Sequence, residues 1–212
     1  MKNLFSALFI LLLLAACTRG PIGKLGSLYW YHDYGIPSKT ALQDRQYVPN
    51  LANAVKDDNP RVGIYAVKAL RRMGPAAERS LPTLAEAAKS DLNIKVRYQA
   101  IVALTEIDKQ SPFTYETLSS LMLSGEPAKV RETAGKWMTT VGASAAPAVP
   151  SLLQALDSRY PKVRNYAVIA LGRIGPLAQA ALPALEKVAR DDDRKTVRDS
   201  AAEAIRQIND GK

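Results

Sequence analysis

The sequence has only one cysteine and one histidine, Cys17 and His32, among its 212 residues. A single cysteine excludes an intramolecular disulfide, and a zinc site needs several cysteine or histidine ligands. A catalytic cysteine–histidine pair would have to consist of these two residues, one of which follows the apolar N-terminal segment directly. Aromatic residues are also scarce, at 7%. Because alanine and leucine are abundant instead, the composition favours packed helices over a β-sandwich.

The rest of the composition is that of one folded domain with a short additional segment. Hydrophobic residues make up 47% and charged residues 23%, which is ordinary for a globular chain. The net charge of +9 could attract nucleic acid, anionic lipid headgroups or acidic proteins. Over residues 47–212, however, 24 Lys and Arg are mixed with 18 Asp and Glu. This mixture forms no basic stripe, so we expect no nucleic-acid partner.

The N-terminus carries a short basic region and then 13 apolar or small residues at positions 4–16, directly before Cys17. A membrane-spanning helix needs about 20 residues, so this run is too short and is typical of a signal peptide. Leu14-Ala15-Ala16-Cys17 resembles the lipobox of bacterial lipoproteins. The resemblance implies that residues 1–16 are a cleaved signal peptide and that Cys17 carries three acyl chains. An ordinary secretory signal or an uncleaved anchor is the alternative.

Residues 17–46 are predicted to form the lipidated cysteine, a tether and an aromatic cap. Gly20 and Pro21 break regular structure and suit a tether. The aromatic cluster at residues 28–34 is interpreted as a cap over the domain that follows, or alternatively as a recognition site. Lipoproteins of Gram-negative type with Asp after the lipidated cysteine stay in the inner membrane. Thr18 at this position therefore implies the periplasmic side of the outer membrane, if the cell has one.

Residues 47–210 contain five copies of one pattern, spaced by 34, 34, 33 and 34 residues. Each copy has a valine, an alanine four residues later, and larger apolar residues eight and eleven residues later. These spacings trace one face of an α-helix, on which the alanine lets a second helix approach closely. The valines are Val62, Val96, Val130, Val163 and Val197, and the alanines are Ala66, Ala100, Ala134, Ala167 and Ala201.

Glycines and prolines divide each copy into two helices. Gly74, Gly142 and Gly175 suit a left-handed residue at the end of the valine-bearing helix, which we term helix B. The other helix of each copy, helix A, is predicted to have a proline in its first turn. These prolines are Pro49, Pro82, Pro150 and Pro183. The third copy lacks this proline, and its helix A is predicted over about 114–123. Its Trp137 replaces an alanine and is interpreted as filling the core, or alternatively as a binding hot spot.

The run Pro161-Lys162-Val163-Arg164, followed by Ala167, Ala170-Leu171 and Ile174-Gly175-Pro176, resembles HEAT-like repeats of the short kind first found in bilin lyases. Tetratricopeptide repeats have a similar length, but their Trp-Leu-Gly-Tyr pattern is missing here. The resemblance implies an all-α fold, a right-handed α-solenoid of about five two-helix repeats. It also implies a ladder between neighbouring repeats, formed by Arg97, Arg131, Arg164 and Arg198 with Asp57, Asp91, Asp157 and Asp192. Alternatively, these arginines read anionic ligands.

The candidate binding residues are those of helix B at two, six and nine positions after the valine, which we expect opposite the core. Helix B lines the concave face in stacks of this kind. Apolar residues rimmed by charge there indicate a protein or peptide site across repeats one to four. The candidates are Ile64, Lys68, Arg71, Tyr98, Val102, Lys136 and Ile169. In the last repeat Asp199, Glu203 and Arg206 replace them and suit a polar end cap.

The sequence thus predicts a lipid-anchored protein-interaction scaffold or adaptor of the cell envelope that is not an enzyme and has no cofactor or metal. No acid–base pair, nucleophile–base pair or metal cluster recurs at useful spacing. One alternative is an accessory subunit or lyase-like enzyme related to bilin lyases. Another is a binder of anionic envelope polymers, whose binding would depend steeply on salt.

Overall fold

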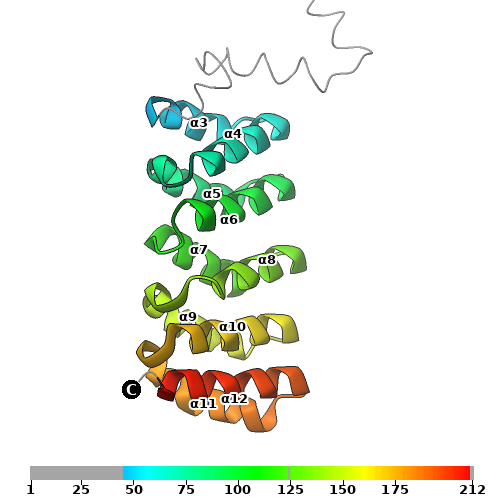
Figure 1. The fold of residues 1–212 in the computed structure, drawn as a ribbon. Coiled ribbons are helices and arrows are strands. Elements are labelled where there is room, and N and C mark those ends of the chain that lie inside the picture. Colours follow the sequence, from blue (N-terminus) through cyan, green and yellow to red (C-terminus); the bar gives the residue numbers. More distant parts are fainter. Residues whose placement is uncertain (1–44, 124, 211–212) are drawn as a thin grey trace, which may run out of the picture. The chain divides into compact units, whose positions relative to one another are not determined.

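A computed structural model describes residues 45–123 and 125–210, where the chain forms ten α-helices and no strand (Figure 1). The signal peptide at 1–16, the lipidation site Cys17 and the aromatic cluster at 28–34 lie outside the described residues. The helices form five successive pairs, repeats one to five. They are α3 (Val48–Val55) with α4 (Pro60–Met73), α5 (Leu81–Ser90) with α6 (Ile94–Asp108), α7 (Pro112–Leu123) with α8 (Ala128–Met138), α9 (Val149–Leu156) with α10 (Pro161–Ile174), and α11 (Leu182–Asp191) with α12 (Lys195–Asp210).

The helices of residues 45–210 lie in two layers. The B helices α4, α6, α8, α10 and α12 follow one another in one layer, and the A helices α3, α5, α7, α9 and α11 form the other (Figure 1). Each helix packs against its own partner and against the helices of neighbouring repeats. This arrangement buries one continuous interior between the layers. The all-α solenoid of five two-helix repeats predicted from the sequence is confirmed.

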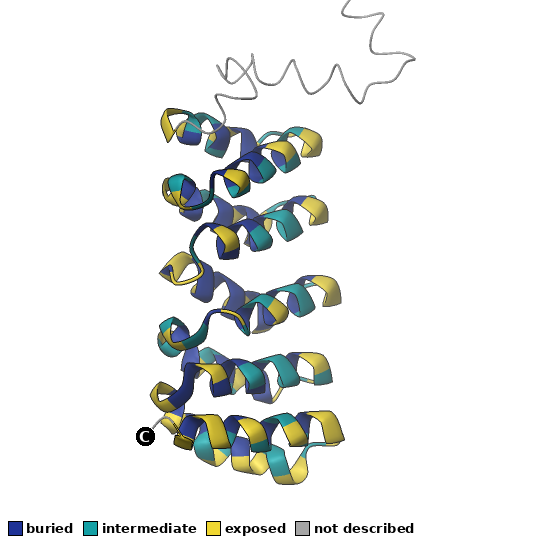
Figure 2. Ribbon diagram, viewed as in Figure 1, coloured by how far each residue is buried: buried dark blue, intermediate teal, exposed yellow. Residues whose placement is uncertain are grey.

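The interior follows the register of the sequence pattern. All five recurring alanines are completely buried, and buried residues gather where helices face one another (Figure 2). Val96, Val130, Val163 and Val197 are buried as predicted. Val62 and Ile205 are only partly buried. They belong to the first and last of the five described repeats, each of which has a described neighbour on one side only.

Three of the four connections between repeats begin with a glycine at positive φ. The φ angles are 55° at Gly74, 74° at Gly142 and 69° at Gly175. The ψ angles of −135° at Gly74 and −142° at Gly175 lie in the mirror image of the extended region, so the predicted left-handed helical cap is wrong in detail. Only glycine adopts this conformation readily. A 3-10 helix then leads to each following A helix, as η3 (Gly74–Ser80), η4 (Gly142–Ala148) and η5 (Gly175–Ala181).

The connection between α6 and α7 is built differently, because Asp108 stands where the other repeats have glycine. The hydroxyl of the buried Thr114 lies 2.7 Å from the carbonyl oxygen of Asp108 and 3.2 Å from that of Leu104. It therefore satisfies carbonyls that the end of α6 would otherwise leave unpaired. Helix α7 begins at Pro112, two residues before the predicted start.

Two apolar features have explanations within the stack. Trp137 on α8 is only partly buried, so it does not fill the core as completely as predicted. The stretch Pro161–Asp191 is long and apolar enough to cross a membrane by length and composition alone. The structure divides it into α10, η5 and α11, and half of its most apolar window is buried within the protein. Its hydrophobicity is that of core helices.

Candidate functional site

The predicted partner-binding residues lie on four successive B helices. They are Ile64, Lys68 and Arg71 on α4, Tyr98 and Val102 on α6, Lys136 on α8, and Ile169 on α10. Lys136 is exposed, and the other six are partly buried. Burial also raises the pKa of the Tyr98 phenol, against the opposing effect of the charge on Arg97. We term these seven residues the helix-B face. Its apolar members are thus less exposed than predicted.

Contacts between neighbouring B helices account for the burial at one of the three candidate positions. A methyl group at Gly172 of α10 would lie 2.9 Å from the Ala204 Cα atom of α12, closer than real contacts allow. Thr105, at the same position in repeat two, is also buried. Arg71 shares this position, and its Nε atom lies 3.4 Å from a Glu106 carboxylate oxygen on α6. The position nine residues after the valine therefore lies between B helices. The prediction that it lies opposite the core is wrong.

Further polar links join the central B helices. The Lys162 ammonium on α10 lies 3.0 Å from the Glu132 carboxylate on α8. Arg173 donates a 2.8 Å hydrogen bond to the Thr139 carbonyl oxygen at the end of α8. In the part of the chain that the structure describes, Lys68 and Lys136 form no ion pair. These two cations are available to a ligand of the helix-B face.

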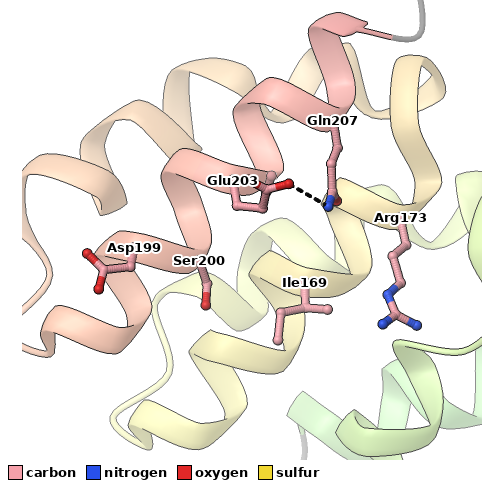
Figure 3. Close-up of a pocket in the computed structure, with 7 residues that line it drawn as sticks. Ile169, Arg173, Asp199, Ser200, Glu203 and Gln207 are labelled. Atoms are coloured by element: carbon pink, nitrogen blue, oxygen red, sulfur yellow. Dashed lines mark hydrogen bonds between the residues drawn. The ribbon is translucent and has the colours of Figure 1, made fainter.

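A cleft of about 350 Å³ lies between α10 and α12, and Ile169 of the helix-B face is one of its lining residues (Figure 3). Ile169 and Arg173 line it from α10, and Asp199 and Glu203 line it from α12. Gln207 donates a 3.1 Å hydrogen bond to Glu203, and the Arg206 guanidinium lowers the pKa of the Glu203 carboxyl. The cleft thus offers one apolar side chain, one cation and two carboxylates, a set that suits a polar peptide segment.

Sequence reasoning had separated these cleft residues. It placed Ile169 in the partner site but assigned Asp199 and Glu203 to a polar end cap. The structure brings all three to one cleft, because α10 and α12 pack closely at Gly172. The glycine at this position was the one available signal, since it marks a close approach of two backbones.

The turns between helices A and B, which we term the A–B turns, carry one predicted pair of the ladder, Arg164 with Asp192, and a second pair in which Arg97 contacts Glu126 instead of a predicted aspartate. Arg164 donates hydrogen bonds of 2.7 and 2.9 Å to the two carboxylate oxygens of Asp192 in the next repeat, and it also contacts Asp193. The bonds from Arg164 lower the pKa of the Asp192 carboxyl, and the same bonds raise the pKa of Arg164. Arg97 is similarly 2.5 Å from a carboxylate oxygen of Glu126 in the next repeat. Both pairs are largely buried and link consecutive repeats.

The ladder is interrupted between repeats three and four, where the sequence assigned Asp157. Asp157 is exposed, and the position equivalent to Asp192 is taken by Ser158. The side chains of Ser158 and Asp192 each accept a hydrogen bond from the backbone N–H two residues later, which shows that these two positions are equivalent. Arg131 instead stacks on the Tyr160 ring, with 3.8 Å between its Cζ atom and the ring centroid. The assignment of Asp157 to the ladder is therefore wrong.

Within residues 45–123 and 125–210, no group of three or more His, Cys, Asp or Glu side chains is placed to hold a metal ion.

The sequence profile of HEAT repeats matches residues 38–105 and 115–206. The chain belongs to the HEAT-repeat family. The gap between the two matched ranges coincides with the connection from α6 to α7, which Thr114 completes in place of a glycine. The HEAT repeats on either side of this gap share the buried alanine of helix B. No curated protein sequence matches this chain.

Several solved structures share the HEAT-repeat fold of this chain. The complex of CpcE and CpcF of phycocyanin lyase from Nostoc sp. PCC7120 is 22% identical, with a TM-score of 0.56, covering 76% of this chain and 99% of that one. A computationally designed armadillo repeat protein for modular peptide recognition is 18% identical, with a TM-score of 0.55 and coverages of 85% and 99%. An engineered protein is 20% identical, with a TM-score of 0.57 and coverages of 81% and 84%. At these identities the likeness concerns the fold alone.

Proposed function

We propose that this HEAT-repeat chain is a lipid-anchored scaffold or adaptor of the cell envelope that binds a protein or peptide partner on its helix-B face. The continuous layer of five B helices carries this proposal, because it supplies a rigid surface that binding does not need to order. The chain has no catalytic role and no cofactor of its own, and nucleic acid is not its partner. The likeness to a repeat protein designed for peptide recognition supports the choice of a peptide or protein ligand.

The residues of the helix-B face favour a mixed polar and apolar contact. Tyr98 and Val102 are partly exposed side by side on α6, where they can pack against a partner. Lys68 and Lys136, on the two flanking B helices, bear unpaired positive charges among the described residues. An apolar centre with a charged rim is typical of protein interfaces, in which tyrosine is a frequent anchor.

The partner site is tested by changing Lys68 and Lys136 to glutamate together with Tyr98→Ala. We expect this triple variant to lose its partner, because it reverses two charges of the rim and removes the aromatic anchor. The measurement is photo-crosslinking in intact cells from a photoreactive amino acid at Val102, followed by identification of the captured protein. Cross-linked product should fall at least tenfold.

A matched control changes surface residues of similar types away from the helix-B face. Arg79 and Lys89 are exposed on η3 and α5, and Phe113 on α7 is 46% exposed. Changing the two basic residues to glutamate together with Phe113→Ala should leave the cross-linked product unchanged. If the helix-B variant captures as much of the same protein as this control does, the partner does not bind at that face.

The membrane anchor is tested separately at Cys17. Feeding cells an alkyne analogue of palmitate should label the wild-type chain, and Cys17→Ser should abolish the label because the serine hydroxyl forms no thioether. Mass spectrometry of the wild type should place the mature N-terminus at residue 17. Three acyl chains would then hold the protein at the membrane, since each buried methylene contributes about 0.8 kcal/mol. Label that persists in Cys17→Ser would rule out this anchor.

The location within the envelope follows from the same segment. We propose the periplasmic side of the outer membrane in a cell that has two membranes, because Thr18 rather than aspartate follows the cysteine. Binding of anionic envelope polymers remains the competing function of the basic surface. Screening weakens contacts between exposed charges beyond about 10 Å at 0.1 M salt. Capture through the helix-B face that survives moderate salt would therefore favour a protein partner.

A further inference from the structure

The interruption of the arginine ladder leaves a buried cation without a carboxylate. Arg131 is only 5% exposed, yet the residue facing it in the next repeat is Ser158, where repeat five has Asp192. A buried guanidinium without an anionic partner is costly, because desolvation is not offset by pairing. Two largely buried arginines of the same ladder, Arg97 and Arg164, have such a partner.

The hydrogen-bonding edge of Arg131 is the same edge that binds a carboxylate in the neighbouring repeat. In Arg164, Nε and Nη2 donate to the two oxygens of Asp192. In Arg131, Nη1 donates to the Glu126 carbonyl oxygen, and Nε has no hydrogen-bond partner among the residues that the structure describes. The ring of Tyr160 covers the face of the guanidinium but cannot accept at its edge. The edge therefore retains the geometry for a two-point contact with a carboxylate.

A cleft of about 620 Å³ opens over Arg131 at the A–B turns of repeats three and four. Ser158, Arg159 and Tyr160 line it from one side, and Glu126, Pro127 and Ala128 line it from the other. The carboxylate of Glu126 is paired with Arg97. Arg159 is exposed, and its Cζ atom lies over the Tyr160 ring, 4.7 Å from the ring centroid. Ala128 begins α8, a helix of 11 residues whose N-terminus has no side-chain cap. Both arginines and this helix end favour an anion.

We propose that this cleft, which we term the turn cleft, binds a carboxylate-bearing ligand that takes the place of the missing ladder acid. The ligand is an acidic side chain of a peptide segment or a free dicarboxylate, which presents the same group. Its carboxylate pairs with the Nε edge of Arg131, while Arg159 supplies a second positive charge. Because Nε is covered, neighbouring side chains must shift as the carboxylate enters. The turn cleft is lined by A–B turn residues and not by the helix-B face, so its occupation is independent of the function proposed above.

The decisive variant is Ser158→Asp, which restores within the chain the acid that repeat five has at this position. Aspartate keeps the hydrogen bond that the Ser158 side chain accepts from the Tyr160 N–H, as Asp192 does from Arg194. The full-length protein in detergent is titrated with a fluorescent peptide of six glutamates and, in parallel, with six glutamines. We expect the wild type to bind the glutamate peptide at least tenfold more tightly than the glutamine peptide. Ser158→Asp should lose that preference and melt at a higher temperature without ligand.

Ser120→Asp is the matched control, because it adds the same charge at an exposed position of α7 outside the turn cleft. It should retain the preference for the glutamate peptide, whereas Arg159→Gln should weaken it several-fold. Competition by sodium succinate at constant ionic strength separates the two sources. Displacement at millimolar succinate identifies a free dicarboxylate as sufficient, and displacement only by the peptide identifies an acidic segment. Equal binding by Ser158→Asp and Ser120→Asp, or no binding by the wild type, overturns the proposal.

Discussion

Ala167→Glu is expected to unfold the repeat domain or leave it folded only weakly, with a loss of more than about 4 kcal/mol in the free energy of unfolding. Ala167 is completely buried on α10. A glutamate there must both displace packed neighbours and place a carboxylate in an apolar interior without a partner. Since a domain of this kind is stable by about 5–15 kcal/mol, the loss is a large fraction of the total. Thermal melting followed by circular dichroism measures it.

The matched control for this change is Ala180→Glu. Ala180 is exposed within η5, so the same substitution adds a solvated charge and should alter the free energy of unfolding by less than about 0.5 kcal/mol. A melting temperature that is the same for both variants would mean that the alanine register of the repeats has been misassigned. A milder change, Ala167→Ser, should fall between the two, because its hydroxyl is small and can bond to the preceding turn of the helix.

Gly172→Leu is expected to detach the last repeat, with a loss of about 3 kcal/mol despite the better helix propensity of leucine. A Cβ atom at Gly172 would lie 2.9 Å from the Ala204 Cα atom and 3.0 Å from its Cβ atom. The Gln207 side chain, whose Oε1 atom would lie 2.5 Å from this Cβ, can move aside. The backbone of α12 at Ala204 cannot, so α10 and α12 must separate. Because repeats contact only their neighbours, the damage should stay local. Hydrogen exchange should quicken in α11 and α12 and remain slow in α4 and α6.

Arg206→Leu provides the control at the same position of the repeat. Arg206 lies on α12, the last described helix, and is exposed. Leucine there removes only a solvent-exposed ion pair with Glu203, and such pairs contribute little to stability. Exchange in α11 and α12 should therefore stay slow. Uniformly faster exchange along all helices in Gly172→Leu would show that the array unfolds as one body rather than from its end.

The fold was largely predictable because the residues that pack between helices recur at a regular spacing in the sequence. Every recurring alanine is buried, as the 34-residue register requires. The limits of prediction lay in contacts between repeats rather than within them. A helical wheel places Arg71 opposite the core of its own helix pair. It contains no information on the next repeat, so it does not predict the pairing of Arg71 with Glu106 on α6. Packing between neighbouring repeats therefore determines which part of a helix face remains exposed to solvent.

The candidate sites show the same distinction. The sequence identifies Arg131 as a ladder residue, but a search five or six residues before each valine accepts Asp157, which lies one residue from the position equivalent to Asp192. A shift of one residue moves a side chain from the interface to solvent in a tight turn. The hydrogen bonds that Ser158 and Asp192 accept show that these two residues correspond, in agreement with their equal spacing of five residues from Val163 and Val197. The residue types alone were thus misleading, and the exact register in the turns decides the assignment.

The unusual connection through Thr114 has a consequence for how the chain can change over generations. At Gly74, Gly142 and Gly175 the positive φ favours glycine over every other amino acid, so substitutions at these positions are selected against. At the link from α6 to α7 the same task falls to a hydroxyl, which serine also supplies. Insertions, deletions and recombination between copies should therefore be accepted more readily at this link than at the other three.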